Sequence, residues 1–282
     1  MRRTHVTLAD IERWHRQGRG VGVGAAYIPW LKTRDVASTG RSRRLRGLKT
    51  GRIHHLLSDL EFKHFLMLEF NEQVIDIREQ YPLFPLDNLM GIANALSIDY
   101  PNYVGTSTPY VLTTDLLATY LDCDGKRRLH ARSVKYACDL ADQHTREKLE
   151  IERVYWKIQG ETWDIATEES VNNILFKNLN WLRFGLGSIR QCFDQPKILR
   201  LLDHLQNHAC RSDCLRTVLE KSALHLAVAD EIIVIWFKYL AWCRLLPLNL
   251  EKERILLTRP LPFLAAPTGI PVTREDSLAW AP

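Results

Sequence analysis

The sequence predicts a mixed α/β N-terminal half followed by a mainly α-helical C-terminal half. Two strand patterns, at 110–121 and 127–137, flank an Asp-Cys-Asp-Gly turn, which is typical of an antiparallel hairpin. A charged amphipathic helix is predicted after the hairpin, at 142–157. After residue 168 the long hydrophobic patterns all have helical spacing, so we predict a domain boundary there.

The other elements follow from spacing along the chain. Between 55 and 71, leucine and phenylalanine recur at helical intervals and predict one apolar helix face. The glycine-rich run at 18–24 has no preceding strand and no following Lys-Ser/Thr pair, so it is interpreted as a flexible loop, not a phosphate-binding motif. The remaining predicted elements are a helix at 6–18, a basic loop at 38–52, strands at 74–77, 162–167 and 254–258, and helices at 171–182, 188–207, 214–227 and 230–245.

Composition excludes several classes of protein. The chain has 282 residues, of which 46% are hydrophobic and 25% charged, and its six cysteines are too sparse for a disulfide scaffold. No run of about 18 uncharged apolar residues is present, so no transmembrane helix is predicted. The N-terminus lacks the apolar run of a secretory signal. A cytoplasmic, reducing location without membrane contact is therefore expected.

Positive charge is concentrated at the N-terminus. Residues 1–55 contain 13 Lys and Arg but only three acidic residues, whereas the rest of the chain contains 25 basic and 30 acidic residues. A basic arm ahead of a mildly acidic body favours an anionic partner such as nucleic acid, although a merely solvated arm has the same composition. The predicted DNA-binding residues are Arg41, Arg43, Arg44, Arg46, Lys49 and Arg52.

Three charged residues lie on faces that are predicted to be buried. Glu61 is on the apolar face of the first long helix, Asp115 is inside the first hairpin strand, and Lys135 is on the small apolar face of the second. An unpaired buried charge is costly, so each of these groups needs a partner. For Glu61 the alternative is a helix edge, where its carboxylate reaches solvent beside His64.

The hairpin turn decides whether two of these charges meet. A three-residue loop with Gly125 in the left-handed conformation pairs residues whose numbers sum to 248, and makes Asp115 a cross-strand neighbour of Ser133 and Lys135. A two-residue Asp-Gly turn gives a sum of 249 and separates them onto opposite faces. We predict the three-residue loop.

A helix glutamate, a strand aspartate and a lysine on the paired strand have the layout of metal-dependent nucleases. Two carboxylates and a main-chain carbonyl supply the oxygen ligands that Mg²⁺ prefers, and Mn²⁺ can substitute for it. Such a metal lowers the pKa of a water molecule and stabilises negative charge on phosphorus. The lysine then stands beside the attacking water or the phosphate.

Longer stretches of sequence extend this layout across residues 8–170. They are Gly18-Arg19-Gly20, Tyr27-Ile28-Pro29-Trp30, Ser58-Asp59-Leu60-Glu61, Leu68-Glu69-Phe70, Val74-Ile75-Asp76-Ile77-Arg78-Glu79-Gln80-Tyr81-Pro82, Thr113-Thr114-Asp115-Leu116-Leu117 and Glu147-Lys148-Leu149-Glu150-Ile151-Glu152-Arg153-Val154-Tyr155-Trp156. Together they closely resemble the TnsA family, the endonuclease subunits of heteromeric transposases.

The resemblance implies three parts to the chain. Residues 1–55 are a basic N-terminal arm with a short helix, 56–168 a restriction-endonuclease-like (PD-(D/E)xK) catalytic domain, and 169–282 a mainly α, winged-helix-like domain with a Pro-rich tail. It also implies Mg²⁺-dependent cleavage of the 5′ strands at transposon ends. The implied partners are double-stranded DNA at those ends, a DDE-type subunit, TnsB, which cuts and joins the 3′ strands, and a regulatory ATPase, TnsC.

The family's catalytic residues correspond to Glu61, Asp115 and Lys135 of this sequence. Where such nucleases usually carry Glu, Asp or Gln two residues before the lysine, this chain has Ser133, which is a weaker and neutral ligand. The carbonyl of Val134 remains a candidate ligand. The alternatives to an active subunit are a DNA-binding or assembly subunit with a vestigial nuclease site, and a stand-alone restriction-type nuclease.

Two further groups of residues are weaker candidates. A zinc site in the C-terminal half lacks a Cys-x₂-Cys pair, and its possible ligands are His204, His208, Cys210, Cys214 and His225. Three glutamates crowd the helix at 142–157, and Glu150 is the one considered for contact with the nuclease site. We expect most of them to be solvated or paired with neighbouring bases; they are Glu147, Glu150 and Glu152.

Overall fold

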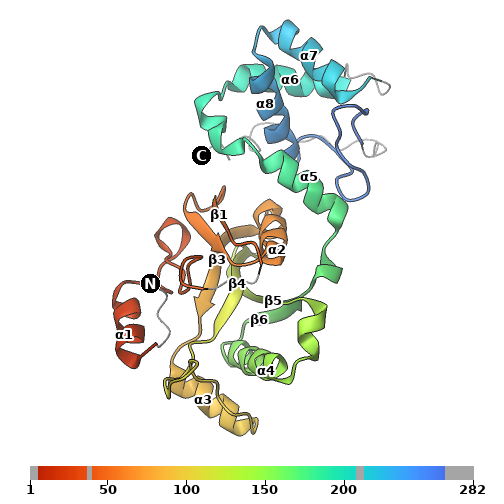
Figure 1. The fold of residues 1–282 in the computed structure, drawn as a ribbon. Helices are drawn as coiled ribbons and strands as arrows, with labels where there is room; N and C mark the ends of the chain where they lie inside the picture. Colours follow the sequence, from red (N-terminus) through yellow and green to blue (C-terminus); the bar gives the residue numbers. More distant parts are fainter. Residues whose placement is uncertain (1–5, 37–39, 208–212, 264–282) are drawn as a thin grey trace. The chain divides into compact units, whose positions relative to one another are not determined.

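The chain folds into two compact units, Met1–Val171 and Asn172–Pro282 (Figure 1). In this computed structural model, residues 6–36, 40–207 and 213–263 are described. Unit 1 is a mixed α/β domain, as predicted for the N-terminal half, and the described part of unit 2 is helical. Within the described residues, no helix is both long and apolar enough to cross a membrane.

Unit 1 is built on a four-stranded sheet with the strand order β3-β4-β5-β6 (Figure 1). The first three strands are antiparallel, and β6 runs parallel to β5 because helix α4 (Gln143–Ile158) returns the chain to the same end of the sheet. The strands predicted in this half are present, although β3 continues five residues further than predicted. The strand bounds are Val74–Pro82 for β3, Thr113–Leu121 for β4, Arg127–Val134 for β5 and Thr162–Ala166 for β6.

The β4–β5 hairpin has the predicted register. Leu116 pairs with Arg132 and Leu121 with Arg127, so the paired numbers sum to 248. Gly125 adopts the left-handed conformation, with φ of 72°, in the tight loop that the prediction required. This register places Asp115 and Lys135 at the same end of the hairpin.

Helix α2 (Asp59–Phe70) lies within the predicted helical segment 55–71. Its N-cap is Ser58, whose hydroxyl accepts a hydrogen bond from the backbone N–H of Glu61 at 3.0 Å. The residues before it form β2 (Ile53–Leu56), which pairs with β1 (Arg43–Arg46) in a separate two-stranded sheet. Part of the predicted basic loop is therefore the first strand of a hairpin. In β2, buried and more exposed residues alternate with the period of a strand, so the helix does not extend back to residue 55.

Opposite faces of the four-stranded sheet are covered by α2 and α4. Consecutive side chains of a strand point to opposite faces. On β4, Thr114 contacts α4 through Glu152, whereas Asp115 faces the side that holds Glu61 of α2. The main core lies on the α4 side and includes Leu83, Leu89, Leu117, Ala131, Ile151 and Trp156.

The N-terminal segment packs against the start of β4 and the end of β3. Helix α1 (Leu8–Arg16), which confirms the predicted helix at 6–18, begins at a Thr7 N-cap. The glycine-rich run is hydrogen-bonded, with the N–H of Gly20 donating to the carbonyl of Ile28 at 2.7 Å. A Cβ on Gly20 would collide with the ring of Pro82, so the loop packs closely at this glycine, whereas residues 21–23 are exposed.

Helix α3 and several 3₁₀ helices are further helical elements. Helix α3 spans Leu86–Ala95 and contributes Leu89 and Ala93 to the core. The 3₁₀ helices within the described residues are Gly24–Ala26, Ala137–Ala141 and Glu168–Ser170 in unit 1, and Leu186–Gln191 in unit 2.

The described part of unit 2 contains four α-helices, and α8 provides much of its core. The aromatic residues of α8 at 236, 237, 239 and 242 are buried and belong to this core. Residues 254–258 do not form the predicted strand, and between 243 and 263 only the bridge Leu248–Phe263 has strand pairing. The winged-helix prediction is therefore not confirmed. The helices are α5, Asn173–Arg183; α6, Gln195–Asn207; α7, Leu215–Leu226; and α8, Asp230–Trp242.

Candidate active site

Asp115 on β4 and Lys135 just after β5 form the centre of the candidate site. The ammonium Nζ of Lys135 lies 2.6 Å from Oδ2 of Asp115, and the backbone N–H of Val134 donates to the same oxygen at 2.7 Å. Lys135 also donates to the carbonyl of Val134 at 3.1 Å. Burial lowers the pKa of Lys135, but the charge and hydrogen bond of Asp115 outweigh it and raise that pKa above the usual value. The lysine is therefore a fixed positive charge.

Glu61 lies in the first turn of α2 and is buried, so the alternative of a solvent-exposed helix edge is wrong. Its carboxylate accepts hydrogen bonds from the N–H of Leu57 at 2.9 Å and from the hydroxyl of Ser58 at 3.2 Å. Burial, together with the negative charge of Asp115, raises the pKa of Glu61 to about 8. Without a cation, Glu61 therefore holds a proton over much of the neutral range.

Gln80 on β3 connects the two acids. Its side-chain Nε2 lies 3.3 Å from Oδ1 of Asp115 and 3.5 Å from Oε2 of Glu61. This residue was not predicted from the sequence, because the strand was expected to end at residue 77. The available sequence signal was that Gln80 is a polar residue at the two-residue spacing of the strand that begins at Val74.

A further buried carboxylate, that of Glu152 on α4, lies on the other side of the sheet. The hydroxyl of Thr114 donates to it at 2.6 Å, and the indole N–H of Trp156 donates to Thr114 at 2.8 Å. Burial raises the pKa of Glu152 to about 7; the Thr114 hydrogen bond lowers it and the charge of Asp115 raises it further. Glu150, the glutamate considered from the sequence, instead pairs with Arg153 at the surface.

Ser133 is buried, but its hydroxyl lies on the α4 side of the sheet, where it accepts a hydrogen bond from the indole N–H of Trp163 at 3.3 Å and contacts Glu152. The prediction that Ser133 shares a face with Asp115 is therefore wrong. The predicted zinc ligands do not assemble in the described residues: no group of three or more His, Cys, Asp or Glu side chains there has the arrangement of a metal site. His208 and Cys210 lie outside the described residues.

The residues present nevertheless fit a hard divalent cation. The carboxylates of Glu61 and Asp115 both lie within hydrogen-bond distance of one amide group, so an atom placed between them can reach both. The repulsion between these acids is what an intervening cation relieves. The atoms of these two residues that could bind a metal are carboxylate oxygens, which are the ligands that Mg²⁺ and Mn²⁺ prefer.

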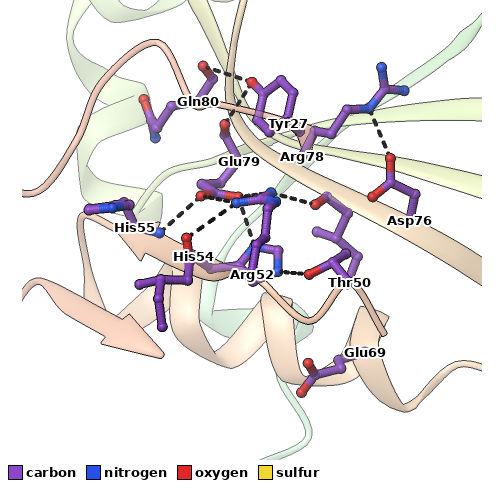
Figure 2. A network of polar contacts seen from close by, with 12 residues as sticks. Tyr27, Thr50, Arg52, His54, His55, Glu69, Asp76, Arg78, Glu79 and Gln80 are labelled. Atoms are coloured by element: carbon purple, nitrogen blue, oxygen red, sulfur yellow. Dashed lines mark hydrogen bonds and ion pairs between the residues drawn. The ribbon is translucent and has the colours of Figure 1, made fainter. Parts of the chain in front are cut away.

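Behind the site, a buried network fixes Glu79, the residue before Gln80 (Figure 2). Arg52 donates to its carboxylate at 2.8 Å, His54 contacts it at 2.8 Å, and the N–H of His55 donates at 2.9 Å. Burial raises the pKa of Glu79, but the hydrogen bonds from Arg52 and His54 outweigh it and lower that pKa to about 2. Arg52 is therefore a structural residue, and the phosphate contact predicted for it does not fit its buried position.

The other predicted DNA-binding residues lie on or near the β1–β2 hairpin. Arg41 and Arg44 are exposed. Arg43 pairs with Asp59 at 2.8 Å and lies over the ring of Phe62, which leaves it half-buried. The remaining two are Arg46, which is exposed and donates to the carbonyl of Gly51, and Lys49, which is half-buried.

The sheet and its acid–lysine cluster are found in a region with known relatives. Residues 71–168 match the family described as TnsA-like endonuclease N terminal. This region contains β3 to β6, Asp115 and Lys135, and is similar to the N-terminal part of an endonuclease family.

Over 174 residues the chain is 46% identical to the transposon Tn7 transposition protein TnsA of Escherichia coli. The match covers 61% of this chain and 62% of that protein, which is less than two thirds of the relative's length. Over these residues the chain is similar in sequence to TnsA.

Proposed function

We propose that this chain is the metal-dependent DNA endonuclease subunit of a transposase, with a restriction-endonuclease-like PD-(D/E)xK domain in unit 1. In this proposal it cuts the 5′ strands at transposon ends. The observation that carries it is the 2.6 Å contact between Lys135 and Asp115, with Glu61 joined to the same cluster through Gln80. The similarity to a Tn7 transposition protein supports the biological setting.

Each member of the cluster has a distinct role. Glu61, Asp115 and the carbonyl of Val134 hold Mg²⁺, with Mn²⁺ as a substitute. The bound metal supplies a water of lowered pKa and neutralises charge on the phosphate. Lys135, held by Asp115, places its positive charge where negative charge develops on the phosphate oxygens. Ser133 is a poor ligand here because its hydroxyl contacts Trp163.

The β1–β2 hairpin, which directly precedes the helix that carries Glu61, is the basic hairpin. It binds the phosphate chain of double-stranded DNA. Arg41, Arg44 and Arg46 are the exposed cations of this segment, whereas Arg52 is excluded by its burial. By analogy with the TnsA family, the partners are a DDE-type subunit, TnsB, which acts on the 3′ strands, and the regulatory ATPase TnsC.

The test is strand-specific cleavage of transposon-end DNA in an assembly reconstituted with the DDE subunit. With Mg²⁺, the wild-type chain should cut the 5′ strand, and Asp115→Ala should not. The matched control is Asp99→Ala, an exposed aspartate of the same unit, which should cut normally. Persisting 3′-strand joining in Asp115→Ala would yield a branched product that a denaturing gel resolves.

Two outcomes would overturn the proposal. A wild-type chain that supports 3′ joining but never cuts 5′ strands, even in Mn²⁺, would be a DNA-binding or assembly subunit with a vestigial site. Efficient cleavage of naked DNA by the chain alone, without the DDE subunit, would identify a stand-alone restriction-type nuclease.

A further inference from the structure

The backbone of Gln80 is held in a conformation that side chains rarely adopt. Its φ is 49°, in the left-handed region, although it lies inside strand β3. The N-terminal segment fixes the backbone here: the N–H of Trp30 donates to the carbonyl of Gln80 at 3.2 Å, and the hydroxyl of Tyr27 donates to that of Glu79 at 3.0 Å (Figure 2). A strained residue that several contacts hold in place is a candidate for function.

This conformation directs the side chain into the cluster of acids. Gln80 lies between two paired positions of the β3–β4 ladder and so stands opposite Asp115. Its side chain is almost completely buried, with 2% exposed. The amide NH₂ faces Glu61 and Asp115, and the amide oxygen accepts from the hydroxyl of Thr113 at 3.1 Å.

The proposed metal site has two acidic ligands, Glu61 and Asp115, and no third. Gln80 occupies the position of a third ligand. The described residues provide no group of three acids, cysteines or histidines, and the hydroxyl of Ser133 contacts Trp163. Neighbouring oxygen ligands of one Mg²⁺ lie about 3 Å apart, given metal–oxygen distances of about 2.1 Å at right angles. The amide group of Gln80 is 3.3 and 3.5 Å from the two carboxylates, close to that separation.

We propose that the amide oxygen of Gln80 is a ligand of the divalent cation. In the metal-free protein the amide NH₂ takes the place of the cation between Glu61 and Asp115; when the cation binds, the amide turns over and presents its oxygen. Thr113 supports both orientations, because a hydroxyl can donate to the amide oxygen or accept from the NH₂. This inference rests on the metal site of the proposed function.

The test is calorimetric titration of the full chain with Mn²⁺, without DNA. Gln80→Leu, which removes both amide atoms at similar volume, should weaken Mn²⁺ binding about tenfold or more. Gln73→Leu, the same substitution at an exposed position just before β3, should leave the affinity unchanged. Asp115→Ala should abolish binding, which reports on the metal site itself.

The outcomes separate the ligand role from the function on which it depends. Mn²⁺ binding that is equal or tighter in Gln80→Leu would show that the amide only competes with the cation, and would overturn the inference while the metal site stands. A wild-type chain that does not bind Mn²⁺ overturns the metal site as well.

A second measurement does not require a folded variant. In wild-type protein with ¹⁵N-labelled glutamine, Mg²⁺ should shift the side-chain NH₂ resonances of Gln80, because the group leaves two carboxylates for the hydroxyl of Thr113. Unshifted resonances at saturating Mg²⁺ would contradict the proposed reorientation.

Discussion

The ammonium group of Lys135 and the backbone N–H of Val134 share one carboxylate oxygen of Asp115, at 2.6 and 2.7 Å. The other oxygen of Asp115 faces Gln80. One strand residue is therefore tied to β5 through one oxygen and to β3 through the other. The contact with β5 depends on the register of a single hairpin, which the turn at Gly125 sets.

Replacing Lys135 should affect stability as well as cleavage. Lys135→Ala leaves the Asp115 and Glu61 carboxylates without their cation, so the metal-free protein should lose about 1–3 kcal/mol of unfolding free energy. This loss is smaller than that expected on breaking a fully buried ion pair, because the side chain of Lys135 is 31% exposed. Mg²⁺ should restore part of that loss, since a ligand of the folded state stabilises it. Urea unfolding with and without Mg²⁺ measures both effects. Equal stability of Lys135→Ala and wild type would show that the pair has no structural effect.

The raised pKa of Glu61 predicts a pH-dependent stability. Its pKa is about 8 in the folded protein and near 4.5 when unfolded, so the folded state holds more protons between these values. The metal-free protein should therefore lose stability as pH rises from 4.5 to 8, and Glu152, with a pKa of about 7, should add to the loss. Glu61→Gln should flatten this dependence and be more stable than wild type at pH 8. Unfolding series at pH 5.5, 7 and 8.5 measure it.

His64 should act in the opposite direction. It is buried on α2 and contacts the carbonyl of Thr167, and burial lowers its pKa to about 4. Because the unfolded state takes up the proton near pH 6.5, its contribution to stability is lost as pH falls from 6.5 towards 4. His64→Gln should remove that part of the pH dependence. The readout is the difference from wild type at pH 5 and 7, since Glu61 titrates in an overlapping range.

The basic hairpin should contribute to DNA affinity through its exposed arginines. Replacing Arg41 and Arg44 with alanine should reduce the slope of log affinity against log salt concentration by about 0.9 for each phosphate that the protein no longer neutralises. The stability of this double variant should equal that of the wild type, because Arg41 and Arg44 are both exposed. Arg52→Ala is the contrasting variant: it leaves Glu79 buried without its main partner and should cost about 3–5 kcal/mol of stability. An unchanged salt slope in the double variant would show that these arginines do not contact phosphates.

Much of the cluster could be predicted from the sequence, because two local rules determine it. The loop ending at Gly125 sets the hairpin register, and charged residues on apolar faces identified Glu61 and Lys135 as groups that need partners. The family resemblance named the same residues independently. These predictions succeeded where neighbouring residues in the chain decide the geometry.

The residues that were missed depend on contacts between distant segments. Gln80 reaches the acids because its left-handed backbone is fixed from residues 27 and 30. Glu152, rather than Glu150, faces the sheet because Thr114 and Trp156 fix the rotation of α4. Arg52 looked like another surface cation because Glu79, its partner, lies 27 residues further along the chain. Local patterns carry no information on such pairings.

The hydrogen bonds of Arg52 and His54 with Glu79 limit how far the chain can be truncated from its N-terminus. A shortened chain that begins at residue 56, where composition separates the basic arm from the body, would lack both bases and leave the Glu79 carboxylate unpaired in the interior. It would also lack Tyr27 and Trp30, which hold the end of β3. An independently folding fragment of unit 1 therefore has to retain the part of the basic arm from Tyr27 to His54, and removal of that part should destabilise the sheet without changing Glu61 or Asp115.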